Sequence, residues 1–488
     1  MKYLLAIDVG TTNVKVAAYT AELKEAAKTK EALKINIYGE AAEQNLEEIY
    51  RATVEAVRSV ARKPEIRGKI GSVFVSSQMH GLALLDSNGK PLTPLYTYLD
   101  RRAAAQAEEL EEKLERKIYE ETGCPPLYIY PLAKLLWIKN RGRLPAKGKI
   151  SVSVKDYILW KLTGNHLIDP STASGSQLLD IHKLQWSGLA LDAAEIEEES
   201  LPTVVREDCE LRLKRDEAER TGLDPNVTLY PGVSDAAAHQ AGVLAFTGKV
   251  LALNIGTSAA IRIASPRPTL DSGGMRFFCY YGFTGRWLVG GAVNNAGVAL
   301  EWLIRKAFNS EGGAETYRAL DEEMLEKEPS DIVFVPFLSG ERFPVRDSKA
   351  KALIAGLTLA HERADIARAL LEGVTFTLKW IYEAMSENGV DVEEIRLGGG
   401  AARLKTWRKI VADVFKLPTI YVKGGAELLG DALILSSIEN GVSIEKIAEK
   451  AAKVVEELEV PGRYAEIYTQ KYEKFKKLYF TTRDMFRK

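Results

Sequence analysis

Cysteine, histidine and methionine are scarce in this sequence of 488 residues, which contains 3, 5 and 6 of them respectively. The cysteines, Cys124, Cys209 and Cys279, lie far apart and form no CxxC pair. Their spacing excludes both a cysteine-based zinc site and a disulfide framework. We therefore expect the protein in a reducing compartment, the cytoplasm.

An excess of charge of either sign is also lacking. The 66 Lys and Arg residues against 67 Asp and Glu residues give a net charge of −1, so no overall field attracts nucleic acid or an acidic membrane. No uncharged stretch approaches the roughly 18 residues of a membrane-spanning helix. We expect neither a nucleic-acid partner nor a membrane association. The 46% of apolar residues is ordinary for a globular protein.

Two segments half a chain apart resemble each other. Residues 4–19 read LLAIDVGTTNVKVAAY, and residues 250–265 read VLALNIGTSAAIRIAS. Each has an apolar run, an Asp or Asn, a glycine with hydroxyl residues and a second apolar run, which is the pattern of a β-hairpin. Asp8 and Asn254 are 246 positions apart (254 − 8 = 246). The repeat predicts two similarly folded halves, residues 1–245 and 246–488, with a ligand cleft between them.

Strand and helix patterns alternate along both halves. Apolar runs predict strands at 70–76, 152–154, 331–337 and 394–397. Helical periodicity predicts helices at 44–61, 101–122, 364–387 and 404–415, and surface helices in the Glu- and Lys-rich segment 443–488. The fold class is therefore α/β.

The first hairpin turn carries groups suited to phosphate. Gly10 permits close backbone approach, the hydroxyls of Thr11 and Thr12 can donate hydrogen bonds, and Lys15 adds a positive charge. Asp8, at the end of the strand, could hold Mg²⁺ through water. The alternative is an ordinary turn rich in turn-forming residues.

Other glycine-rich segments could complete such a site. The second turn carries Gly256 and Thr257 and could grip a triphosphate from the opposite side. The segment LGGGAA at 397–402 follows a strand and precedes a helix, where backbone N–H groups can bind an anion or adenosine. A further segment, GGAVNNAG, occupies 290–297.

Asp235 is the candidate general base. It is the last residue of the sequence GVSD (232–235), which follows the apolar strand predicted at 227–230. A carboxylate at a strand end that opens on a cleft can accept a proton from a substrate hydroxyl. The alternative is an N-cap for the helix that begins at the next three alanines.

Six motifs in order resemble the FGGY carbohydrate kinases, members of the superfold that includes actin and hexokinase. They are IDVGTTNVK, SQMHG (77–81), GVSDAAA (232–238), NIGTS, PFLSGER (336–342) and LGGGAA. The segment 352–357 with Asp365, Ile366, Ala369 and Glu372 is similar to the family's C-terminal signature. The resemblance covers essentially the whole chain. It implies two actin-like, ribonuclease H-like ATPase domains, with the N-terminal half mainly for the sugar and the C-terminal half mainly for ATP.

The resemblance also implies roles for individual residues. Asp235 would be the catalytic base and Asp8 would position Mg²⁺ on ATP. The ATP contacts would come from Thr11, Thr12, Lys15, Gly256, Thr257, Gly297, Glu301, Gly399, Gly400 and Leu404. The sugar contacts would come from Gln78, Met79, His80, Asp100, Arg102 and Asp235, with His80 as a donor to a sugar hydroxyl. At Leu404 some relatives have a polar residue, and leucine offers no such contact.

Several stretches look most like gluconokinases, so gluconate is the first expected substrate. Its carboxylate could be bound by Arg102 or Arg342. Gly81 is more like xylulokinases, which keeps a ketopentose such as xylulose, or another polyol, as the alternative. A non-catalytic actin-fold ATPase or a sugar sensor is the alternative of another class. The resemblance is also compatible with a homodimer.

Overall fold

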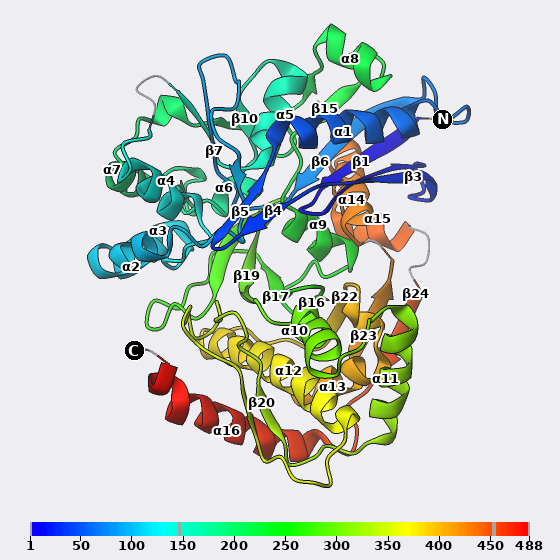
Figure 1. The fold of residues 1–488 in the computed structure, drawn as a ribbon. Helices are drawn as coiled ribbons and strands as arrows, with labels where there is room; N and C mark the ends of the chain where they lie inside the picture. Colours follow the sequence, from blue (N-terminus) through cyan, green and yellow to red (C-terminus); the bar gives the residue numbers. More distant parts are fainter. Residues whose placement is uncertain (1, 145–147, 425, 451–454, 487–488) are drawn as a thin grey trace.

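Two mixed β-sheets, one in each half of the chain, form the frame of the molecule (Figure 1). The computed structural model describes residues 2–144, 148–424, 426–450 and 455–486. The sheet of the N-terminal half has the order β14-β15-β6-β1-β2-β3. Its strands are β14 (Leu211–Arg212), β15 (Thr228–Tyr230), β6 (Ile70–Ser77), β1 (Tyr3–Val9), β2 (Asn13–Tyr19) and β3 (Glu25–Ala32).

The sheet of the C-terminal half repeats this arrangement, with the order β18-β19-β17-β16-β22-β23-β24. Its strands are β18 (Phe278–Phe283), β19 (Arg286–Val293), β17 (Ala259–Ser265), β16 (Val250–Ile255), β22 (Glu394–Gly398), β23 (Thr419–Lys423) and β24 (Val455–Glu459). In both sheets an antiparallel hairpin, β1–β2 or β16–β17, has a third antiparallel strand on one side and two parallel strands on the other. The predicted hairpins and the actin-like α/β fold are confirmed. The division at residue 245 stays a prediction.

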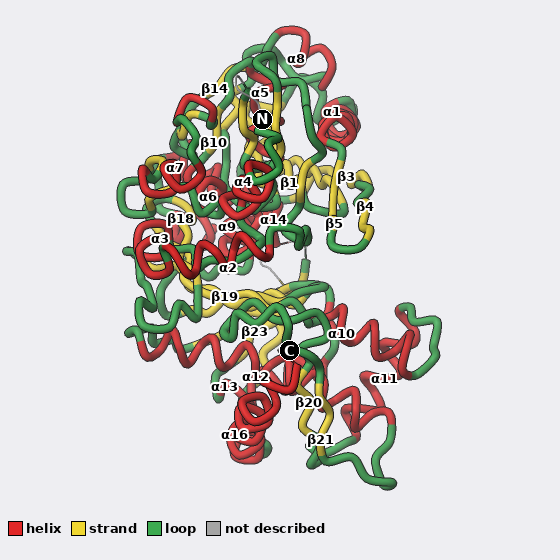
Figure 2. The backbone as a smooth tube through the Cα atoms, turned by 60° about the vertical axis from the view of Figure 1, so that its left-hand side comes forward, coloured by secondary structure: helices red, strands yellow, loops and turns green. Residues whose placement is uncertain are grey.

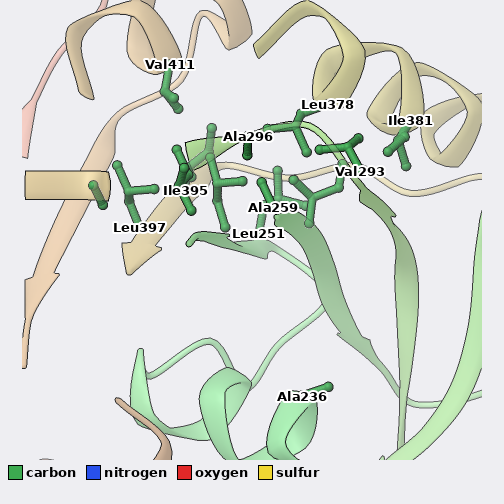
Figure 3. Packing of buried hydrophobic residues seen from close by; sticks show 14 of the residues in the cluster. Ala236, Leu251, Ala259, Val293, Ala296, Leu378, Ile381, Ile395, Leu397 and Val411 are labelled. Atoms are coloured by element: carbon green, nitrogen blue, oxygen red, sulfur yellow. The ribbon is translucent and has the colours of Figure 1, made fainter. Parts of the chain in front are cut away.

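Helices cover the outer faces of the two sheets. Helix α1 (Leu46–Ala61) begins where the side chain of Asn45 accepts a hydrogen bond from the N–H of Glu48, and its apolar stripe packs on β2 and β3. In the C-terminal half, α12 (Arg363–Glu387), α13 (Lys405–Phe415) and α16 (Ala465–Thr482) lie beyond the second sheet (Figure 2). The apolar core between that sheet and these helices includes Val293, Leu378, Ile381, Ile395 and Val411 (Figure 3).

Two helices, α9 (Asp235–Gly242) and α14 (Ala426–Asn440), pack against each other between the sheets. A Cβ atom at Gly242 would lie 1.7 Å from the Ala426 carbonyl oxygen, and one at Gly430 would lie 1.8 Å from that of Ala238. The helices therefore touch backbone to backbone. Helix α14 also packs on β1, so a helix from the C-terminal half covers the N-terminal sheet.

Three predicted segments differ from the structure. The strand predicted at 152–154 is wrong, because β9 is Lys149–Ser151 and a capping box of Ser153 and Asp156 starts helix α5 (Val154–Thr163). The helix predicted at 101–122 is two helices, α2 (Ala104–Lys113) and α3 (Glu115–Thr122). Segment 443–488 contains β24 as well as α15 (Ile444–Lys450) and α16. Over the described ranges, no helix is long and apolar enough to cross a membrane.

Candidate active site

Two adjoining cavities lie where the two hairpin turns face each other. The His80 cavity, of about 180 Å³, is lined by Gln78, His80, Tyr280 and Arg342 among others. The Asp8 cavity, of about 280 Å³, is lined by the first turn, the second turn and Glu427. Thr11, Tyr98, Asp235, Asn254, Ser258 and Arg262 line both cavities. The two cavities therefore meet at a wall that includes Asp235.

Asp235 is the first residue of α9 and does not cap the helix. The cap is Ser234, whose hydroxyl accepts a hydrogen bond from the N–H of Ala237 at 3.2 Å. Gly232 has φ +76°, and a Cβ there would lie 2.0 Å from the Val75 carbonyl oxygen, so only glycine lets this connection pass so close to β6. The carboxylate of Asp235 is left to face the cavities.

The surroundings of Asp235 favour a proton acceptor that works near neutral pH. Burial raises the pKa of the Asp235 carboxyl to about 7, and the charge of Asp8 contributes in the same direction. Behind the site, the buried Lys155 forms an ion pair with Asp169 at 2.8 Å and donates to the carbonyl of Val233. This pair fixes the backbone just before the helix that carries Asp235.

Asp8 and Lys15 form an ion pair on the wall of the Asp8 cavity. Lys15 Nζ lies 2.9 Å from Asp8 Oδ2 and 3.4 Å from Glu427 Oε2. Burial raises the pKa of Asp8 to about 6, against the lowering effect of Lys15. The other carboxylate oxygen, Oδ1, is shielded from solvent and has no hydrogen-bond partner in the described part of the chain.

This free oxygen fits a Mg²⁺ ion that keeps most of its water. Mg²⁺ in phosphate-binding sites commonly takes only one or two carboxylates, with water and phosphate completing the octahedron. Among the described residues, no three His, Cys, Asp or Glu side chains converge as a metal-binding set. Asp8 would therefore contribute to a metal held mainly by a bound nucleotide.

The second turn is supported by the predicted glycines. The N–H of Gly297, the first residue of α10 (Gly297–Trp302), donates to the Gly256 carbonyl at 3.0 Å, and the N–H of Val298 donates to that of Thr257 at 3.0 Å. A Cβ at Gly399 would lie 2.4 Å from the Ile255 carbonyl oxygen. The structure thus brings Gly256, Thr257, Gly297 and Gly399 together.

Of the remaining predicted ATP contacts, Thr12 lines the Asp8 cavity, whereas Glu301, Gly400 and Leu404 are not among the described residues that line it. Gly400 adjoins Gly399 and has open space around a Cβ position. Glu301 is exposed on α10 and pairs with Arg305 at 2.9 Å. Leu404 precedes α13 and is buried in the apolar core. On the opposite side, the Thr12 hydroxyl accepts a hydrogen bond from the Asn13 side chain at 2.9 Å.

Gln78 links the substrate loop to the first turn. Its Oε1 accepts a hydrogen bond from the Thr11 hydroxyl at 2.8 Å, and its Nε2 donates to Gln44 Oε1 at 2.9 Å. Met79 is buried and lines the His80 cavity beside it. Both polar ends of the Gln78 amide are therefore engaged, which favours a positioning role.

His80 has a defined orientation. Its φ is +66°, its Nδ1 lies 2.6 Å from the Gly175 carbonyl oxygen, and burial lowers its pKa to about 3. A neutral ring that donates from Nδ1 presents Nε2 as an acceptor. The predicted donor role is therefore revised: His80 can accept a hydrogen bond from a sugar hydroxyl. The buried Lys134 ammonium holds the His80 carbonyl at 2.6 Å.

Asp100 and Arg102 are engaged with each other instead of facing the cavities. Arg102 Nη2 lies 2.6 Å from both Asp100 Oδ2 and Glu43 Oε1, and the guanidinium stacks 4.7 Å from the Trp137 ring. Over the described ranges, neither Asp100 nor Arg102 lines the two cavities, whereas the neighbouring Tyr98 lines both.

Sequence reasoning missed Arg262, which lies on β17 and lines both cavities. A signal was present, because Arg262 is the one charged residue in the apolar strand AAIRIAS. Glu427 was also missed: it lies at the start of α14, and its proximity to Lys15 depends on the packing of α14 across the N-terminal sheet.

Comparisons with known proteins agree with this geometry. The N-terminal domain of the FGGY family of carbohydrate kinases matches residues 3–242, and the C-terminal domain of that family matches residues 251–437. A gluconokinase of Bacillus subtilis is 33% identical over 435 residues, which is 85% of this chain and 83% of the relative. A xylulose kinase of the same organism is 29% identical over 494 residues, covering 99% of this chain and 98% of the relative.

A solved structure supports the same assignment. The crystal structure of a gluconate kinase from Lactobacillus acidophilus superposes with a TM-score of 0.91 at 27% identity, over 99% of this chain and 98% of that chain. The duplicated sheet, the paired turns and the two domain matches point to one conclusion: the chain belongs to the FGGY family of carbohydrate kinases, which transfer phosphate from ATP to a sugar hydroxyl.

Proposed function

We propose that this kinase transfers the γ-phosphoryl group of ATP to a hydroxyl of gluconate or a closely related sugar acid, in the cytoplasm. The observation that carries the proposal is the position of Asp235 on the wall common to the two cavities. A sugar in the His80 cavity and a triphosphate in the Asp8 cavity would meet at this carboxylate. The three cysteines of the protein are free thiols, in keeping with the proposed location in a reducing compartment.

Asp235 acts as the general base in this proposal. Its carboxylate accepts the proton of the attacking hydroxyl as the oxygen approaches phosphorus. A pKa of about 7 leaves a substantial fraction of the group deprotonated at neutral pH. The rigid connection through Gly232 and Ser234 keeps the carboxylate at one place relative to both cavities.

The two turns hold the phosphates. Backbone N–H groups and hydroxyls of the first turn, with Lys15, lie on one side of the Asp8 cavity, and Gly256 and Thr257 lie on the other. Mg²⁺ bound with ATP would neutralise phosphate charge, and Asp8 would orient it through water. Gly297 and Gly399 support the second turn. Contacts of ATP with Glu301, Gly400 and Leu404 are part of the proposal on the strength of the family resemblance alone.

Gluconate is the first candidate acceptor, and a ketopentose such as xylulose is the second. The gluconokinase relative favours gluconate. The xylulose kinase relative favours xylulose, as does Gly81, which follows Met79 and His80. The small volume of the His80 cavity, about 180 Å³, lies below the roughly 300–1,000 Å³ of sites for drug-sized ligands and suits a short polyol chain. A non-catalytic ATPase or sugar sensor would not need Asp235 at the meeting point of the cavities.

A coupled ADP-release assay tests the proposal. Purified protein with Mg²⁺ and ATP is supplied with gluconate, xylulose, ribulose or glycerol at matched concentrations. We expect one acceptor class to accelerate ADP release well above the rate without acceptor, with gluconate first. Equal ADP release with and without every acceptor would contradict the proposed function and favour a sensor or a non-catalytic ATPase.

A further inference from the structure

Two arginines face the His80 cavity without an acidic partner. Arg262 projects from β17, and Arg342 comes from the loop after β20 (Val333–Val335). Arg342 is buried, and its Nε has no hydrogen-bond partner among the described residues; the same holds for Nε and Nη1 of the half-buried Arg262. No ion pair of either guanidinium is found within the described part of the chain. Arginines shielded in this way normally have an anion beside them.

The nearby carboxylates do not supply that anion. Glu341 turns away and accepts hydrogen bonds from the N–H of Asn294, the Asn295 side chain and the N–H of Arg342. Burial raises its pKa to about 7, so its negative charge is weakened at neutral pH. Asp235 lies near Arg262 but is also raised to a pKa of about 7. The cavity therefore has a positive character that a neutral sugar would leave uncompensated.

The position of Arg342 indicates that the missing anion is a carboxylate and not a phosphate. Arg342 lines the His80 cavity beside Phe343 and Tyr280, and it is not on the wall of the Asp8 cavity, where the phosphates would lie. Arg262 lies on both walls. A planar guanidinium with free N–H groups can bind a carboxylate through two parallel hydrogen bonds.

We infer that Arg342, assisted by Arg262, binds the carboxylate of the acceptor, so that the enzyme selects sugar acids over neutral sugars. This inference rests on the proposed function and names the feature that decides its substrate class. Of the two arginines that the sequence offered for this task, Arg102 is neutralised by Asp100 and Glu43. Arg342 donates from Nη2 to the Val293 carbonyl at 3.4 Å, and its Nε has no hydrogen-bond partner among the described residues. Arg342 is thus a specificity-determining residue.

The test measures binding and turnover separately. Calorimetry without nucleotide gives the Kd of gluconate and of glucitol, its neutral analogue, for the wild type, Arg342→Gln, Arg262→Gln and a control, Arg212→Gln, an exposed arginine on β14. We expect Arg342→Gln to weaken gluconate binding on the order of 10–100-fold, as for a lost charge-assisted bond, and Arg262→Gln to weaken it less. The control should bind gluconate like the wild type, and the Kd of glucitol should change less than twofold in every variant.

The outcomes distinguish this inference from the proposed function. Equal weakening of gluconate and glucitol in Arg342→Gln, or no gluconate binding by the wild type, would overturn the inference. Absence of acceptor-stimulated ADP release with intact, Arg342-dependent gluconate binding would overturn the kinase proposal and leave the carboxylate site standing. Arg342→Lys keeps the charge without the bidentate fork; an intermediate Kd in this variant supports the inference even if Arg342→Gln fails to fold.

Discussion

The two hairpin turns occupy the same place in two equivalent sheets, yet they differ in charge and length. In the first, Val9 pairs with Val14 across a turn of residues 10–13; in the second, Ile255 pairs with Ala259 across residues 256–258. The second turn is therefore one residue shorter. As a result Asp8 lies opposite Lys15, whereas Asn254 lies opposite Ala260.

This difference indicates that the two hairpin turns have different roles, although they lie at equivalent places in the two sheets. The first turn has a carboxylate and an ammonium group that lie 2.9 Å apart. The second has a neutral amide, packed where a Cβ at Gly399 would lie 2.4 Å from Asn254 Oδ1. A second carboxylate, facing the first from the other side of a bound triphosphate, would repel the triphosphate. The second turn thus contributes shape and backbone N–H groups, and the first turn contributes the charged pair Asp8 and Lys15.

Removal of Asp235 is the strongest challenge to this assignment. We expect Asp235→Asn to lower kcat on the order of 10²–10⁴-fold, because the variant has no group to accept the hydroxyl proton. Acceptor-dependent ADP release checks this, with Asp192→Asn, at an exposed position on α7 (Gly188–Ala194), as the matched control. Full turnover by Asp235→Asn would mean that the base lies elsewhere.

The same variant should be more stable than the wild type at alkaline pH. The folded-state pKa of Asp235, about 7, lies above the value of roughly 3.9 for an unfolded chain. The folded protein therefore binds this proton more tightly, and its free energy of unfolding falls as pH rises from about 4 through 7. Thermal unfolding should give Asp235→Asn a Tm several degrees higher at pH 8 and a much smaller difference at pH 4.5. Equal differences at both pH values would contradict this linkage.

Exchanging the residue types at Asp8 and Asn254 tests which of the two turns positions the metal. The expected change is smaller than the loss of kcat in Asp235→Asn. We expect Asp8→Asn to raise the Mg²⁺ concentration needed for half-maximal rate roughly 10–100-fold, the usual cost of losing a group that orients a metal through water. Asn254→Asp places a carboxylate in the other turn and serves as the paired variant. Mg²⁺ titration of the initial rate measures both. If Asn254→Asp alone showed the larger change, the second turn would be the one that manages the metal.

The pH profile gives the smallest of these effects. Because the base must be deprotonated, kcat/KM should fall about tenfold per unit below pH 7 and level off above it. The negative charge of Asp8 helps to raise this pKa, so the midpoint in Asp8→Asn should move to lower pH. Rates at saturating Mg²⁺ between pH 5.5 and 8.5 test both statements. A flat profile in the wild type would exclude Asp235 as the titrating base.

Local patterns sufficed to predict the hairpins, the glycine segments and the place of Asp235, since each depends on a few consecutive residues. The sequence did not show that Ser234 would cap α9, because Ser234 and Asp235 are both good caps and only the backbone path decides between them. Nor did it show that Arg102 would be engaged by Glu43, 59 residues away, or that Glu427 would reach Lys15, 412 residues away. Such contacts depend on tertiary packing, which composition and periodicity do not encode.

The backbone contact between α9 and α14 has a consequence for how this protein can evolve. Each helix carries a side chain of the site near its start, Asp235 on one and Glu427 on the other. Their separation depends on residue volume at Gly242 and Gly430, since even one methyl group would meet a carbonyl oxygen within 2 Å. Selection on catalysis therefore acts on these glycines without any ligand touching them. A lineage that enlarged either one would have to move the two helices apart, because the added methyl group would meet a backbone carbonyl oxygen, which no substitution on the facing helix removes.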